Sequence, residues 1–278
     1  MTTQPVVMVA VSGPAHQHPA IDWALTYAPS VNAAVELVHV VDMSWRATPA
    51  SFAEEALLAA ERELRALAAH YSTLSGSEVR ATVLVGHPTR LLVEHAAAAE
   101  LIVLGARGHN GYGMRQLNTV AVRVAAQVNV STVVVPHSAP TGTGIVVGVD
   151  GSEFSVAPLA FAAREADRTG EPLIVVHSWR APRPWSDDTV QGWPAEPEDE
   201  ERRILSEAVA GIAQSYPDLK VHSEVVFGQA TSTLYGASES ARMLVVGSHG
   251  RHGFARAWLG STSEELLLAM PTTVAVVR

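Results

Sequence analysis

The sequence lacks cysteine and is poor in charged residues, above all in lysine. Without cysteine, a disulfide framework and a thiolate metal site are both excluded. Charged residues make up 17% of the 278 residues and hydrophobic ones 47%, which is typical of a folded chain and not of a disordered one. Lys220 is the single lysine among 19 basic residues, so chemistry that needs a lysine has one candidate.

The sequence also lacks a long hydrophobic run. No stretch approaches the ~18 consecutive apolar residues of a membrane span. The first residues do not combine a basic and an apolar segment as a secretion signal does. Because 28 acidic residues outnumber 19 basic ones, the net charge of -9 argues against a general nucleic-acid binder. We therefore expect a cytoplasmic protein that binds neither nucleic acid nor membrane.

What the sequence does contain is an internal repeat. Val6–Ser12 reads VVMVAVS and Ile145–Ser152 reads IVVGVDGS, and both are apolar runs that end in a turn of small residues. The second apolar run of each copy contains a histidine, His39 in one and His177 in the other. An internal repeat of this length indicates duplicated domains. The expected first domain, linker and second domain cover residues 1–137, 138–144 and 145–278.

Short apolar runs alternate with longer helical patterns in each copy. In the second copy the expected strands cover 145–150, 172–178, 221–227, 243–247 and 273–277, and the expected helices fall near 155–169, 198–215, 229–241 and 261–269. Strands that are apolar on consecutive positions are typical of a sheet covered on both faces. Strand–helix alternation favours parallel strands joined by right-handed crossovers. The predicted fold class is α/β, with two tandem doubly wound parallel five-stranded sheets flanked by helices.

Glycines and hydroxyl groups gather after two strands of the second copy. Asp150 and Gly151 follow its first strand, and the pattern Gly-x2-Gly-x9-Gly-Ser follows its fourth. In a doubly wound sheet, two such loops meet where the ligand crevice forms. Glycines let the backbone approach a ligand, and amides at the start of a helix attract phosphate. We therefore expect the glycine pattern to hold phosphate, and Asp150 to hold a ribose hydroxyl or Mg²⁺.

The same residues also allow a structural interpretation. In it the glycines only form turns, and Ser261 begins a capping box, STSE, at the start of the last helix. Because the glycine pattern lies between a predicted strand and a predicted helix, phosphate binding is favoured over this alternative. His249 and Arg251 fit either a contact with a triphosphate or a solvated basic loop. His39 and His177 are interpreted as hydrogen-bonded core imidazoles.

The repeated pattern resembles the universal stress protein family in its tandem form, over nearly the whole chain. The resemblance rests on VVGVDGS at 146–152, VVFGQA at 225–230 and LVVGSHGRHGFARAWLGSTSEELL at 244–267. It implies the family's adenine nucleotide alpha hydrolase-like fold, ATP with Mg²⁺ as the ligand, and adenine read by the backbone that ends the second strand. The nucleotide-binding residues that it implies are Val149, Asp150, Gly151, Ser178, Gly247, Gly250, Gly260, Ser261 and Ser263, with Asp150 beside the metal.

The first copy departs from the family's pattern in two places. Ser12 stands where the second copy has Asp150, and Asn118 stands where it has Gly260. Loss of the carboxylate removes a ribose or metal contact, and asparagine adds a side chain beside the phosphates. We expect this first site to be weak or empty. The residues that would line it are Val11, Ser12, Val40, Gly105, Gly108, Asn118 and Thr119.

By this resemblance, the predicted function is a nucleotide-dependent regulator of the stress response that binds ATP in its second domain and acts on an unidentified protein partner. The family's dimers pair through their last strands. Because we expect Thr273–Val277 to be an exposed edge strand, we predict a homodimer. No P-loop, nucleophile elbow or His-Glu-x2-His motif is present, so we assign no catalytic residue and expect at most weak ATP hydrolysis.

Two alternatives stay open. One is a slow ATPase or an adenylyl- or phosphoryl-transferring enzyme of the same fold, and the other is a partner-binding module without nucleotide. The segment 179–200, rich in tryptophan, proline and acidic residues, fits either a lid over the nucleotide site or a surface excursion.

Overall fold

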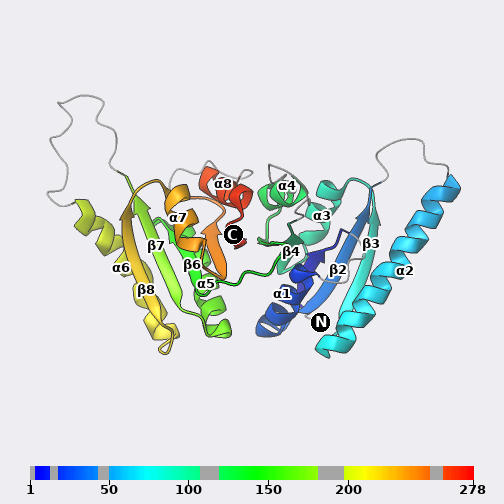
Figure 1. Ribbon diagram of the computed structural model, residues 1–278, viewed down its shortest axis with the longest axis horizontal. Helices are drawn as coiled ribbons and strands as arrows, with labels where there is room; N and C mark the ends of the chain where they lie inside the picture. The colour runs from blue at the N-terminus through cyan, green and yellow to red at the C-terminus, as the bar shows by residue number, and fades with distance from the viewer. Residues whose placement is uncertain (1–3, 13–17, 43–49, 107–118, 181–196, 251–258) are drawn as a thin grey trace, which may run out of the picture. The chain divides into compact units, whose positions relative to one another are not determined.

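The computed structural model describes residues 4–12, 18–42, 50–106, 119–180, 197–250 and 259–278 (Figure 1). The chain divides into two compact units, Met1–Ala139 and Pro140–Arg278, which we call unit 1 and unit 2. None of the described helices combines the length and the hydropathy that a membrane crossing requires.

Unit 1 contains a parallel sheet with the strand order β3-β2-β1-β4-β5. Its strands are β1 (Val6–Ala10), β2 (Ala34–Val41), β3 (Val79–Val85), β4 (Leu101–Gly105) and β5 (Ser131–Val135). Helices α1 (Pro19–Tyr27) and α2 (Ala50–Ser75) cover one face, and α3 (Pro88–Ala96) and α4 (Thr119–Gln127) cover the other. A short 3-10 helix, η1 (Ala28–Val31), follows α1. Helices on both faces make this a doubly wound sheet.

Unit 2 repeats the arrangement with the order β8-β7-β6-β9-β10. Its strands are β6 (Ile145–Val149), β7 (Leu173–Trp179), β8 (Val221–Phe227), β9 (Met243–Gly247) and β10 (Thr273–Val277). The 3-10 helix η2 (Glu153–Ser155) leads into α5 (Val156–Thr169), which shares one face with α6 (Pro197–Ser215), and α7 (Ala230–Ser238) and α8 (Ser261–Ala269) share the other. The predicted α/β class with two doubly wound parallel sheets is confirmed.

The strands expected in unit 2 agree with the structure to within one residue at each end. The helix expected near 229–241 is shorter, because α7 ends at Ser238 and the chain then turns back toward β9. In that turn the N–H of Ala241 donates to the carbonyl oxygen of Ser238 at 3.1 Å. The glycine and serine content of α7 gives it low intrinsic helix propensity, which agrees with an early end.

The core of unit 2 lies on both faces of its central strands. Val146 and Val147 are adjacent in β6, Leu244 and Val245 are adjacent in β9, and none of the four is exposed. Adjacent residues of a strand point to opposite faces, so this burial requires helices on both. Burying one such side chain contributes about 1.5–3 kcal/mol, which explains why these strands are apolar without alternation.

The central strands β6 and β9 separate toward their carboxyl ends. They pair from Ile145 opposite Met243 only as far as Val147 opposite Val245, whereas β6 remains paired with β7 to its last residue. The chain winds outward in opposite directions from β6, so this is the switch point of the sheet. The separation opens a crevice between the loops that follow the two strands.

The exposed edge expected at Thr273–Val277 concerns backbone pairing and stays a prediction, whereas the side chains of this strand are covered. Every residue of β10 is buried, and Val274, Ala275 and Val276 have no exposed surface. Helix α5 contacts β10 from one face of the sheet and α8 contacts it from the other, so its side chains are covered on both sides.

The chain that enters unit 2 packs tightly against the segment preceding β9. The N–H of Thr143 donates to the carbonyl oxygen of Ser240 at 2.9 Å, and the N–H of Gly144 donates to Glu171 Oε2 at 2.7 Å. The other oxygen of Glu171 accepts from Arg242 Nε at 2.9 Å. Part of the segment expected to be a linker, 138–144, is therefore bound to this unit.

Replacing Gly142 with alanine should destabilise unit 2. The new β-carbon would lie 2.2 Å from the carbonyl oxygen of Ser240 and 2.4 Å from its carbonyl carbon. Backbone atoms cannot move aside as a flexible side chain can, so we expect the free energy of unfolding to fall by about 1–3 kcal/mol. Urea-induced unfolding followed by tryptophan fluorescence measures the change.

The matched control is Gly211→Ala in α6, where a β-carbon meets nothing within 4 Å. Alanine in a helix interior should raise the free energy of unfolding by about 0.5–1 kcal/mol. Equal unfolding midpoints for the two variants would contradict the packing described for Gly142.

Candidate functional site

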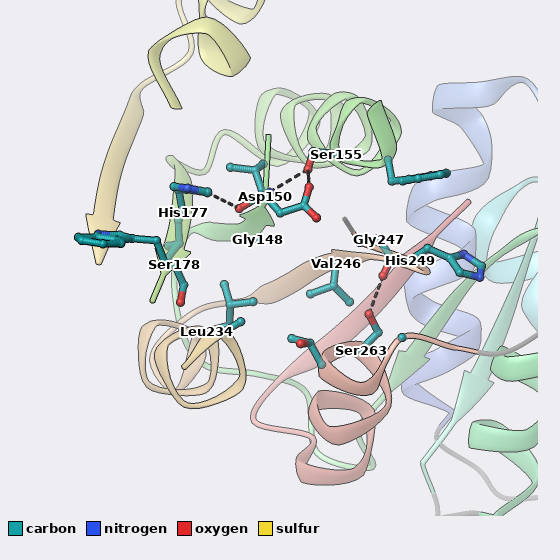
Figure 2. A pocket seen from close by; sticks show the side chains of 18 of the residues that line it. Gly148, Asp150, Ser155, His177, Ser178, Leu234, Val246, Gly247, His249 and Ser263 are labelled. Carbon is teal, nitrogen blue, oxygen red and sulfur yellow. Dashed lines mark hydrogen bonds between the residues drawn. The ribbon is translucent and has the colours of Figure 1, made fainter. Parts of the chain in front are cut away.

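A pocket of about 510 Å³ lies at the carboxyl ends of the strands in unit 2 (Figure 2). It is lined by the loops that follow β6 and β9, by the end of β7, and by the first residues of α7 and α8. Eight of the nine residues expected to bind nucleotide line it, namely Val149, Asp150, Ser178, Gly247, Gly250, Gly260, Ser261 and Ser263. The ninth, Gly151, is not among the lining residues; it has a φ of 74° and forms the turn that follows Asp150.

The carboxylate of Asp150 is held by the turn that follows β6. Its Oδ1 accepts hydrogen bonds from the N–H of Ser152 at 2.9 Å, the hydroxyl of Ser152 at 2.5 Å and the hydroxyl of Ser155 at 2.8 Å. Gly151 adopts a positive φ that L side chains rarely reach, and this lets the chain curl back onto the carboxylate. The turn therefore fixes the orientation of Asp150 without any ligand.

Two of the three glycines of the Gly-x2-Gly-x9-Gly-Ser pattern are favoured by the packing of the protein itself. A β-carbon on Gly247 would lie 3.0 Å from the carbonyl oxygen of His249. One on Gly250 would lie 2.9 Å from Asp150 Oδ2, so this oxygen faces the loop after β9. At Gly260 a β-carbon would meet nothing closer than 3.4 Å, and the φ of -60° suits any residue. The packing around Gly260 alone does not require glycine.

The start of α8 presents backbone donors to the pocket. Its N-cap is Gly260, and the N–H of Glu264 donates to the carbonyl oxygen of Gly260 at 2.9 Å. The preceding N–H groups, those of Ser261, Thr262 and Ser263, therefore have no acceptor within the helix. No side chain caps α8, so the capping box that Ser261 would begin is not formed.

The hydroxyl of Ser263 connects α8 to the end of β9. It donates to the carbonyl oxygen of Gly247 at 2.6 Å, and the residue is buried (Figure 2). A serine hydroxyl has one hydrogen, so this side chain has none left to donate to a phosphate oxygen. What Ser263 offers a phosphate is its backbone N–H.

The opposite end of the pocket is formed by β7 and α7. The hydroxyl of Ser178 donates to the carbonyl oxygen of Gly228 at 2.9 Å, which leaves the backbone of Ser178 to meet a ligand. The carbonyl oxygen of Trp179 accepts from the N–H of Gly228 on the β8 side. Successive strand carbonyls point to opposite sides, so that of Ser178 points past the end of β6.

Apolar residues line the floor between these two ends. Val176, Leu234 and Val246 contribute to it, and Figure 2 shows Leu234 and Val246 pointing into the pocket. A β-carbon on Gly148 would lie 2.7 Å from Leu234 Cδ1. Gly148 therefore lets α7 approach β6 closely. Leu234 has no signal in the sequence that marks it as a pocket residue, because its role depends on where α7 crosses the sheet.

His177 forms part of the pocket wall and is 2% exposed. Its Nδ1 lies 2.9 Å from the carbonyl oxygen of Val149, and its Nε2 lies 2.6 Å from Glu201 Oε2 on α6. The prediction of a hydrogen-bonded core imidazole is confirmed. Sequence reasoning missed Glu201, since its partner lies 24 residues earlier and no pattern connects them.

His249 lines the pocket through the loop after β9, but Figure 2 shows its ring turned away from Asp150. Its Nδ1 lies 3.0 Å from the hydroxyl of Ser248. Arg251 falls outside the described residues. The described part of this loop therefore favours backbone groups over the imidazole as phosphate contacts.

The residues expected at the first site occupy matching places in unit 1. Val11 and Ser12 follow β1, Val40 lies near the end of β2, Gly105 ends β4 and Thr119 begins α4. Val11 is buried and Ser12 is exposed. Gly108 and Asn118 lie outside the described residues.

Within the described ranges, no group of three or more histidine, aspartate or glutamate side chains is placed to hold a metal ion. A single carboxylate, that of Asp150, is enough for a Mg²⁺ site, because that ion is usually bound by one or two carboxylates together with substrate phosphates and water. A cation here would depend on the nucleotide for most of its ligands.

Comparison with known proteins agrees with the duplicated fold. The universal stress protein family matches residues 5–136 and again residues 143–278. A universal stress protein of Mycolicibacterium smegmatis is 30% identical over 288 residues, covering 98% of this chain and 96% of that protein. The crystal structure of a universal stress protein from Archaeoglobus fulgidus superposes with a TM-score of 0.70 at 18% identity, covering 98% of this chain and 96% of the other.

A further universal stress protein was solved in complex with cAMP. It covers 51% of this chain and 99% of its own, with 25% identity and a TM-score of 0.39, so it says nothing of the ligand here. The two family matches, the relative aligned along almost the whole chain and the shared fold agree with one another. This chain belongs to the universal stress protein family, and it carries two tandem copies of the family's domain.

Proposed function

We propose that unit 2 binds ATP together with Mg²⁺, and that the chain acts in the cytoplasm as a nucleotide-dependent regulator of the stress response. One observation carries this proposal. A fixed carboxylate, Asp150, and the start of α8 line the same pocket at the switch point of the sheet. Ligands of open α/β sheets bind at this place, and the pocket volume lies within the usual range for small-molecule sites.

The start of α8 supports a polyphosphate at one end of the pocket. Backbone N–H groups and the helix dipole both favour negative charge at a helix start. A hydrogen bond to a charged group contributes about 1.5–3 kcal/mol. Three such bonds from residues 261–263 would supply much of the roughly 8 kcal/mol that micromolar affinity requires.

Asp150 supports the sugar and the cation in the middle of the pocket. Its Oδ1 is committed to Ser152 and Ser155, and its Oδ2 faces the loop at Gly250. A carboxylate in that place can accept from a ribose hydroxyl or bind a Mg²⁺ ion that the phosphates also coordinate.

Ser178 and the apolar floor support the base at the far end. The carbonyl oxygen of Ser178 can accept a hydrogen bond from an exocyclic amino group, which adenine carries. The side chains of Leu234 and Val246 provide the apolar surface on which a flat base packs. The start of α8, Asp150, and Ser178 with the apolar floor therefore follow one another along the pocket in the order in which a nucleotide has its phosphates, sugar and base.

The described pocket does not favour catalysis. Both ring nitrogens of His177 are engaged by Val149 and Glu201, and the ring of His249 points away. Neither imidazole is therefore placed to act as a general base. We propose binding without efficient hydrolysis, with a homodimer and a nucleotide-responsive protein partner as the family resemblance implies.

Gly260→Ala should weaken ATP binding while leaving the fold intact. The methyl group fits the protein itself, since its nearest neighbour would be Ser248 O at 3.4 Å, but it would project beside the α8 amides. Loss of one charged hydrogen bond predicts an affinity reduced about tenfold to a hundredfold. Isothermal titration with MgATP measures the affinity, and it should also give a stoichiometry of one nucleotide per chain.

The control is Gly236→Ala in α7, where a β-carbon meets nothing within 4 Å. Its affinity for ATP should equal that of the wild type. An unchanged affinity for Gly260→Ala, with thermal unfolding as in the wild type, would remove the phosphate site from this place.

Asp150→Asn separates the role of the cation from that of the fold. Asparagine keeps an oxygen that accepts from Ser152 and Ser155 but removes the charge. We expect affinity for ATP in chelator to stay the same or rise, because a negative charge beside the phosphates is gone. The gain in affinity that Mg²⁺ gives the wild type should disappear. Titrations with and without Mg²⁺ measure the two affinities. If Mg²⁺ still raises the affinity of the variant, the cation is bound by residues other than Asp150.

A further inference from the structure

Helix α6 reaches the pocket through Glu201. Of the described residues of α6, Glu201 alone lines the pocket, and 19% of its side chain is exposed. The other acidic and basic residues around it are paired with one another on the outer surface. Arg202 bonds Glu198 and Asp199, and Arg203 bonds Glu200 and Glu207. Within the described chain, the ion-pair partner of Glu201 is His177.

The contact between Glu201 and His177 contains a proton. The carbonyl oxygen of Val149 can only accept, so Nδ1 of His177 must donate to it. At 2.6 Å, the Nε2 of His177 and the carboxylate of Glu201 need a proton between them, whichever of the two holds it. Removing the carboxylate leaves a buried ring nitrogen without its partner.

The contacts form a continuous path from α6 to the site of the ligand. Glu201 orients His177, His177 holds the carbonyl of Val149, and Val149 directly precedes Asp150. His177 itself directly precedes Ser178, whose backbone lines the end of the pocket proposed for the base. A rotated imidazole would therefore release the carbonyl of Val149, directly beside Asp150.

Unit 1 contains half of this arrangement. Nδ1 of His39 lies 2.7 Å from the carbonyl oxygen of Val11, so the contact between ring and backbone belongs to the fold of both units. No carboxylate in the described part of unit 1 forms an ion pair with His39. The acidic partner is present in the unit that also has Asp150 and the complete glycine pattern.

We propose that Glu201 is a positioning residue of the nucleotide site, and that through His177 it couples occupancy of the pocket to the docking of the first turns of α6 on the sheet. This inference rests on the proposed function of unit 2. Coupling is reciprocal, so a nucleotide that needs the ordered wall must also stabilise α6 against local opening. The charged outer face of α6 would then report occupancy to a partner.

The test compares Glu201→Ala with Glu201→Gln in the full chain, using MgATP as the probe. Alanine removes the partner of Nε2, so affinity should fall about fivefold to thirtyfold. The glutamine amide can donate to Nε2 of a neutral ring and should restore most of the affinity. Glu207→Gln, a matched control in an exposed ion pair of the same helix, should bind as the wild type does.

Hydrogen exchange provides the second measurement. In the wild type, MgATP should slow amide exchange in residues 198–205, and in Glu201→Ala this effect should be lost. Wild-type affinity in Glu201→Ala, equal losses in both Glu201 variants, or no change in wild-type exchange on saturation would each overturn the inference. If Glu201→Ala does not fold, exchange in the wild type decides. A wild type that does not bind ATP would instead reject the proposed function itself.

Discussion

The separation of β6 and β9 is the constraint on which the rest of the site depends. The two strands pair only to Val147 and Val245, so the loops that follow them leave the sheet in different directions. The turn after β6 holds a carboxylate, and the loop after β9 leads to the start of a helix. Both face one pocket because the winding of the chain reverses between these two strands.

The structure changes the meaning of the glycine pattern. Gly250 makes room for Asp150, and Gly247 makes room for the backbone of the loop itself. Packing favours glycine at both positions even if nothing binds there. Gly260 has no such reason, and it lies beside N–H groups that the helix leaves without acceptors. The strongest sign of a ligand is therefore the third glycine and not the number of glycines.

The fold could be predicted from the sequence, because apolar strands and helical spacing repeat in both copies and local signals agree with each other. The pocket loops could be predicted because turn chemistry is local, as in the glycine that follows Asp150. Contacts between distant elements could not. Glu201 meets His177 across 24 residues, and Leu234 of α7 packs directly over Gly148 of β6.

The central claim is that backbone amides at the start of α8 bind a polyphosphate, and amide NMR tests it most directly. When MgATP is added to the ¹⁵N-labelled protein, the signals of Ser261, Thr262 and Ser263 should shift in a saturable way, and the signal of Ser178 should shift with the same midpoint. Signals of the described residues of α4 in unit 1 should stay in place. Saturable shifts elsewhere, with these three amides unmoved, would contradict the account.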